Sequence, residues 1–159
     1  MFANNGYKTI VVVGGDGALN DAINGIMASD APEKSSIAIG LIPNGIGNDF
    51  ADYWGLTLDY KVAVDWIINN RKKKIDVGIC SYYNGKSHEK RYFLNAVNIG
   101  LGARIVSITD QTKRFWGVKF LSYVAALFLL FFERKLYRSH LKINDEHIRG
   151  RIMTVCVGS

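Results

Sequence analysis

Residues 10–21 read IVVVGGDGALND, and residues 37–50 read IAIGLIPNGIGNDF. Each stretch begins with a short apolar run rich in β-branched residues, which is typical of a buried parallel strand. The first run ends at Gly14-Gly15, and the second ends at the turn Pro43-Asn44-Gly45. The first is followed by Leu19, Ile23 and Ile26 at helical spacing, and the second leads to a short helix predicted from Asn48 to Trp54. This repeated order of strand, loop and helix predicts a parallel α/β sheet.

The pattern changes after the basic run 71–74. Before it, a third helix is predicted to start at Asp59, as the N-cap, and to stop at Asn69. After it, apolar residues alternate and Asn84-Gly85 is a hairpin signal, which favours antiparallel strands. We therefore expect two domains, a parallel α/β domain over 1–73 and an antiparallel β domain over 74–159. The second domain is predicted to hold helices at about 101–132 and strands at about 136–143 and 148–157.

Composition narrows the class of protein. The 159 residues are 48% hydrophobic with a net charge of +6, which suits a globular protein with an anionic partner such as a nucleotide, an acidic membrane surface or nucleic acid. The start of the chain does not resemble a secretion signal, and Cys80 and Cys156 have no metal-binding spacing, so we expect a cytoplasmic protein with buried thiols. The apolar run 118–132 is shorter than the roughly 20 residues of a membrane span and is interpreted as a buried helix rather than a membrane-dipping one.

The first glycine loop has the features of a phosphate-binding site. Gly14, Gly15 and Gly17 allow backbone N–H groups to approach an anion, and the following helix adds partial positive charge. A carboxylate at Asp16 would be repelled by phosphates unless it meets Mg²⁺ or accepts a proton from an attacking hydroxyl. The alternative is a tight turn in which Asp16 caps the helix. Neither a Walker A motif nor a Rossmann fingerprint is present.

The second loop repeats the arrangement. Gly45 and Gly47 permit close backbone approach, while Asn48 and Asp49 offer side-chain ligands for a ribose, a phosphate or a hydrated metal. Because parallel strands end at the same edge of a sheet, we expect the two loops to lie side by side there.

Four segments, VVVGGDGALNDAINGIM, IGLIPNGIGNDFADYWG, IDVGI and RYFLNAVNIGLGA, resemble the catalytic region of the diacylglycerol kinase family, which includes bacterial lipid kinases and sphingosine kinases. NAD kinases are similar in the first loop but differ in the second, and phosphofructokinases share only the first. The resemblance implies that 1–73 is a partial α/β nucleotide-binding domain and that 74–159 is a partial β-sandwich. It implies ATP and Mg²⁺ as cosubstrates and phosphorylation of a lipid hydroxyl. It also implies catalytic roles for Asp16, Asp49 and Asp76, with Asp16 also a metal ligand. The implied nucleotide-binding residues are Gly14, Gly15, Asp16, Gly17, Asn20, Asn44, Gly45, Gly47 and Asn48.

Two positions depart from the family pattern. Ala18 and Ile46 stand where threonines are usual, so two hydroxyl groups expected near the nucleotide are missing. The family pattern also extends beyond both ends of this sequence, and the general base of the bacterial branch is expected past Ser159. We therefore expect a truncated chain with impaired activity.

Three functions follow from these observations. The leading one is an ATP-dependent lipid kinase acting on diacylglycerol or a related lipid. The alternatives are a non-catalytic remnant that binds nucleotide or membrane, and an NAD-kinase-like enzyme. For the leading function we expect peripheral contact with an anionic membrane surface in the cytoplasm and no specific nucleic-acid partner. Exposed sheet edges also predict a homodimer.

Overall fold

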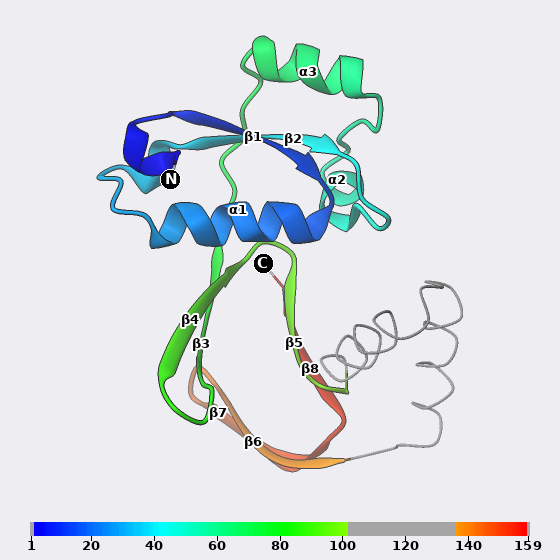
Figure 1. The fold of residues 1–159 in the computed structure, drawn as a ribbon. Coiled ribbons are helices and arrows are strands. Elements are labelled where there is room, and N and C mark those ends of the chain that lie inside the picture. Colours follow the sequence, from blue (N-terminus) through cyan, green and yellow to red (C-terminus); the bar gives the residue numbers. More distant parts are fainter. Residues whose placement is uncertain (1, 102–135, 159) are drawn as a thin grey trace, which may run out of the picture. The chain divides into compact units, whose positions relative to one another are not determined.

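The computed structural model describes residues 2–101 and 136–158 (Figure 1). These residues form two compact units, which are described separately below. The first contains the chain up to Ala96 together with Gly158, and the second lies within Val97–Val157. The domain boundary predicted near residue 74 stays a prediction.

The first unit alternates strands and helices and then ends in a hairpin. The predicted parallel pair and all three predicted helices are present, so the α/β part of the fold prediction is confirmed. Its elements are η1 (Ala3–Asn5), β1 (Thr9–Gly14), α1 (Asp16–Ala28), η2 (Lys34–Ser36), β2 (Ala38–Pro43), α2 (Asp49–Tyr53), α3 (Tyr60–Ile68), β3 (Gly78–Tyr83) and β4 (His88–Phe93).

Helices α1 and α3 cover opposite faces of the β1–β2 pair (Figure 1). On one face, α1 buries Leu19, Ile23 and Ile26. On the other, α3 packs closely on β2, where a Cβ added to Gly40 would come within 2.8 Å of Ile67. A larger residue at position 40 would therefore force the Ile67 side chain to move.

The sequence predicts that β1 is buried on both faces, and the structure differs. Val11 lies beside Gly40 in the parallel register, so both share the face that α3 covers. Because α3 packs over β2 rather than β1, Val11 and Val13 stay 49% and 61% exposed.

Helix α3 begins as predicted. The Asp59 side chain accepts a hydrogen bond from the Lys61 backbone N–H at 2.8 Å, which satisfies one of the free donors of the first turn. The helix ends at Ile68, just before the predicted stop at Asn69.

The hairpin of β3 and β4 is also confirmed, and its turn is built by Asn84. The Asn84 side-chain oxygen accepts from the backbone N–H groups of Lys86 and Ser87 at 2.8 and 2.9 Å, while Gly85 takes the positive φ of 95° that the turn needs. The strands pair antiparallel, with Gly78 opposite Phe93.

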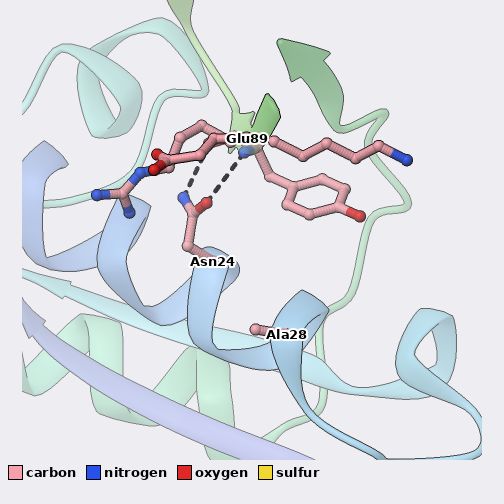
Figure 2. Close-up of a pocket in the computed structure, with 6 residues that line it drawn as sticks. Asn24, Ala28 and Glu89 are labelled. Atoms are coloured by element: carbon pink, nitrogen blue, oxygen red, sulfur yellow. Dashed lines mark hydrogen bonds between the residues drawn. The ribbon is translucent and has the colours of Figure 1, made fainter. Parts of the chain in front are cut away.

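The Asn24 side chain fastens this hairpin to α1. The Asn24 amide nitrogen donates to the Tyr92 carbonyl at 2.9 Å, and the Asn24 oxygen accepts from the Tyr92 N–H at 3.0 Å. Figure 2 shows Asn24 reaching from the helix toward the strand with both bonds dashed. Since both Tyr92 backbone groups point to Asn24, they point away from β3. Asn24 therefore occupies the place that another strand would take along this edge.

The second unit contains one antiparallel hairpin and one further strand pair. Tyr137–Ile143 (β6) pairs antiparallel with Glu146–Ile152 (β7), while Ala96–Gly100 (β5) pairs with Thr154–Gly158 (β8). The single strand predicted over 148–157 is wrong, because it divides at Met153. There the Met153 carbonyl accepts from the Leu101 N–H at 3.0 Å, and the chain changes its pairing partner from β6 to β5. The predicted helical segment 101–132 lies almost wholly outside the described residues.

The Asn24 contact predicts the exchange behaviour of one amide. Replacing Asn24 with Ala removes the acceptor of the Tyr92 N–H, so hydrogen exchange of that amide should accelerate by roughly tenfold, as expected for one net hydrogen bond. The Asp21→Ala change on the same helix is the control, because the exposed Asp21 side chain makes no hydrogen bond to any described residue. Unchanged exchange at Tyr92 in N24A, measured by NMR, would contradict this role.

Candidate active site

The two glycine loops leave the β1–β2 pair at one edge, as the sequence predicts. Gly14 ends β1 directly beside Pro43, which ends β2. One residue later the Asn44 N–H donates to the Gly14 carbonyl at 3.0 Å, which extends the parallel ladder into the loops. Both loops therefore begin next to each other at the same edge of the sheet.

The loops then touch through their backbones. A Cβ added to Gly15 would come within 2.9 Å of the Gly45 Cα, and one added to Gly45 would come within 2.5 Å of the Gly15 Cα. No side chain fits in this contact without moving backbone. The sequence accounts for these glycines by the approach of a phosphate, and the structure adds a second requirement, which is the approach of one loop to the other.

Asp16 links the first loop to the helix that follows the second. Its carboxylate accepts from the backbone N–H of Phe50 at 2.8 Å and of Asp49 at 3.1 Å, and the Asn95 side-chain amide lies 3.4 Å away as a third donor. Asp49 and Phe50 are the first two residues of α2, whose own N-cap, Asn48, makes no capping bond. Asp16 thus supplies the cap from a different loop, a variant of the capping that the sequence suggested for its own helix.

These bonds set the protonation of Asp16. Burial raises its pKa, but the N–H groups of Phe50 and Asp49, its own backbone N–H and the Asn95 amide together leave the pKa below its ordinary value. The carboxylate is therefore ionised at neutral pH, with much of its hydrogen-bonding capacity already directed at α2.

Asn48 shapes the second loop from within. Its side-chain oxygen accepts from the Gly45 N–H at 2.8 Å, and its amide donates to the Gly45 carbonyl at 3.0 Å. Its own backbone is left-handed, with φ of 58°, a conformation that asparagine tolerates better than most residues. Asn48 holds Gly45 against Gly15.

Asp49 is the carboxylate that remains available. It is exposed, and its side chain has no hydrogen-bond partner in the part of the chain that the structure describes. A Cβ added to Gly47 would lie 3.4 Å from an Asp49 carboxylate oxygen and 3.5 Å from an Asp16 oxygen, so both carboxylates border the same glycine. Of the predicted acidic residues, Asp16 and Asp49 come together.

The remaining predicted residues are placed less closely. Gly17 and Asn44 are exposed at the loops, and Asn20 lies one turn after Asp16 on α1, half-buried. Asp76 lies exposed between α3 and β3, and no contact with either loop is seen among the described residues. Their assigned roles stay predictions.

Two asparagines of the site escape the sequence interpretation. Asn95 follows β4 and reaches Asp16, while Asn24 holds β4 on α1. In the sequence, the sign of these roles is that a polar residue stands at each position among apolar ones. That sign cannot identify the partner of either asparagine, which lies some 70 residues away.

The residues of the two loops are suited to binding ATP and Mg²⁺. Exposed backbone at Gly17 and Gly47 suits a phosphate chain, whereas the Gly45 N–H already donates to Asn48. No group of three or more His, Cys, Asp or Glu side chains gathers among the described residues. Mg²⁺, however, is commonly held by one or two carboxylates together with substrate phosphates and water, so Asp49 beside Asp16 fits that ion.

Comparison with known proteins identifies the family. Residues 1–80 match the family model described as "Diacylglycerol kinase catalytic domain". The chain belongs to this family. The resemblance stated from the sequence is thereby confirmed, and the family is one of lipid kinases.

Individual relatives agree with the family match. A protein named "Diacylglycerol kinase" from Staphylococcus carnosus is 36% identical over 107 residues, which cover 67% of this chain and 30% of that relative. A "Probable lipid kinase YegS-like" from Cronobacter sakazakii is 27% identical over 159 residues, covering 99% of this chain and 49% of its own length. The chain thus spans half or less of the length of these diacylglycerol-kinase-family relatives.

A solved structure supports the fold. The crystal structure of a "putative diacylglycerol kinase" from Bacillus anthracis aligns with a TM-score of 0.63 and 20% identity, over 95% of this chain and 47% of that one. The fold predicted from sequence, a parallel sheet followed by antiparallel strands, is the fold of this diacylglycerol-kinase-family member. In the described segments, none of the helices has the length and apolar character to cross a bilayer.

The cap that Asp16 provides predicts a pH-dependent stability. Asp16→Asn should lower the free energy of unfolding by about 1–2 kcal/mol at neutral pH, because it weakens the bonds to the start of α2. A lowered native pKa gives stability that is present above the ordinary value of 3.8 and is lost as pH falls through the native pKa. The gap between wild type and D16N should therefore shrink in acid.

Asp49→Asn is the matched control, since it removes a neighbouring carboxylate that makes no hydrogen bond to any described residue. Urea unfolding over a series of pH values measures all three proteins. A gap between wild type and D16N that is the same at neutral and acid pH would rule out the carboxylate cap.

Proposed function

We propose that the chain carries the nucleotide-binding loops of an ATP-dependent lipid kinase that transfers the γ-phosphate of ATP to the hydroxyl of diacylglycerol or a related lipid. The observation that carries the proposal is the contact of the two loops. It brings exposed backbone at Gly17 and Gly47 beside a carboxylate, Asp49, that no described residue engages.

Each loop residue has a part in this reaction. Backbone N–H groups of the glycine loops would hold the phosphates of ATP. Asp49, with Asp16 beside it, would hold the Mg²⁺ ion that accompanies these phosphates. Mg²⁺, when bound, offsets the negative charge of the phosphates. Asp16 has a second role, because its bonds to α2 fix the position of Asp49, the first residue of that helix.

The transfer itself is an in-line displacement. A bond forms between the lipid oxygen and the γ-phosphorus, the bond from that phosphorus to the bridging oxygen of ADP breaks, and the hydroxyl proton passes to a base. Such transfer depends mostly on positioning and charge stabilisation, which a rigid pair of loops supplies. Asp76 stays a proposed member of a polar network that leads to the metal.

The setting of the reaction follows from the substrate. A lipid acceptor lies in a membrane, so we propose that the enzyme works in the cytoplasm as a peripheral membrane protein. A homodimer is also proposed from the sequence.

A second candidate is nucleotide binding without transfer. Ile46 favours it, because this apolar side chain is 86% exposed in the second loop where the family pattern has a threonine. Binding of Mg·ATP without labelled lipid product would support this candidate over the kinase.

The experiment is transfer of labelled phosphate from ATP to diacylglycerol in neutral mixed micelles by the full-length protein. Labelled lipid is expected, and Asp49→Asn should lower the rate by about a hundredfold or more because it removes a metal-holding carboxylate. Asp52→Asn is the control, as Asp52 is an exposed carboxylate on the same helix.

Two results would overturn parts of this proposal. Folded protein that labels no lipid would refute the kinase. Full activity in D49N, with the kinase intact, would refute only the assignment of Asp49.

A further inference from the structure

The β6–β7 hairpin gathers basic residues on one face. Side chains alternate along a strand, and residues directly opposite in the register share a face. Counted this way, three consecutive pairs on the same face contain only Arg, Lys or His, and all six residues are exposed. This basic face consists of Arg138 opposite Arg151, His140 opposite Arg149, and Lys142 opposite His147.

The other face of the hairpin has a different character. It holds Leu141 opposite Ile148, and its half-buried positions are Ser139, Leu141 and Ile152. Glu146 lies on this second face, opposite Ile143, and Asp145 lies in the turn. The acidic residues of the hairpin are therefore separated from the basic face.

The positive charge of the basic face is not balanced by a described part of the chain. Like charges directly opposite each other destabilise a strand pair, yet Arg138 faces Arg151. Within residues 2–101 and 136–158, no carboxylate bonds to any of the six. The two histidines bond to each other, with 2.9 Å between ring nitrogens. Neither histidine therefore uses an arginine as its partner, and the arginine side chains can bind a ligand.

The basic face also carries a shallow hollow that is open to solvent. Its volume is about 570 Å³, and it is lined by Arg138, His140, Arg149 and Arg151 together with Ser139 and Gly150. Arginine pairs with phosphate through two parallel N–H bonds, and three arginines border this hollow. Its chemistry suits phosphate groups.

We propose that the basic face of the β6–β7 hairpin docks on a bilayer that contains anionic phospholipid. The row from Arg138 to Lys142 spans roughly 14 Å, which is enough to meet several headgroups at once. No Phe, Tyr or Trp side chain lies on this face, whereas proteins that bind single-stranded nucleic acid stack bases on such rings. The choice of a membrane over nucleic acid rests on the proposed lipid kinase, whose acceptor lies in a membrane.

The test measures binding to vesicles and needs no catalysis. Full-length protein is sedimented with vesicles of phosphatidylcholine and phosphatidylglycerol, or of phosphatidylcholine alone. Binding should require phosphatidylglycerol and weaken with salt. The double change Arg149→Gln and Arg151→Gln should weaken it by about 25-fold, since each cation near an anionic surface contributes roughly fivefold.

Two further variants separate docking from net charge and from misfolding. Arg149→Lys with Arg151→Lys keeps the charge and should keep most of the binding. Lys86→Gln with Lys90→Gln makes the same charge change on the exposed β3–β4 hairpin and should leave binding at the wild-type level. Equal losses in the two glutamine variants would overturn the proposal.

Competitors identify the source of the phosphate. Displacement from vesicles by inorganic phosphate at matched phosphate concentration would assign the face to a free anion. Tighter binding to a single-stranded oligonucleotide, lost in R149Q/R151Q, would assign it to nucleic acid. Either result would overturn the proposal. The neutral micelle assay of the kinase contains no anionic lipid, so failure of docking and failure of the kinase are distinguishable.

Discussion

The contact between the Gly15 and Gly45 backbones is the constraint on which the first unit depends. The two strands end side by side at Gly14 and Pro43, so both loops leave the sheet at the same edge. The close approach of Gly15 and Gly45 then keeps the loops together. Asn48 then holds Gly45 in place, and Asp16 crosses to cap α2. The proposed site is thus held in place by bonds within the protein itself, which would lower the cost of ordering it when a ligand binds.

Helix α1 carries this constraint to the hairpin. Its first residue, Asp16, bonds to α2 and lies near Asn95, while Asn24, two turns later, bonds to Tyr92. One short segment of the chain, 92–95, is therefore attached to α1 at two points. The hollow beside Asn24 and Glu89, of about 320 Å³, lies along this attachment and includes none of the loop residues (Figure 2).

Local patterns predicted most of the elements, because each depends on neighbours in sequence. Apolar spacing located α1, the Asp59 cap located α3, and Asn84-Gly85 located the first hairpin. The errors concern distant partners. The exposure of Val11 depends on where α3 packs, and the break at Met153 depends on pairing with β5. In the site, the sequence predicted that the two loops lie side by side. It did not predict that Asp16 caps α2, because that contact depends on how the two loops fold against each other.

The most direct test of the loop contact compares two glycine substitutions by urea unfolding. Gly45→Ala places a methyl group 2.5 Å from the Gly15 backbone, whereas a Cβ at Gly17 meets nothing within 4 Å. G45A should therefore lose about 1–3 kcal/mol of unfolding free energy, while G17A, at the start of α1, should keep or slightly gain stability. Wild-type stability in G45A would contradict the contact, and with it the preformed site.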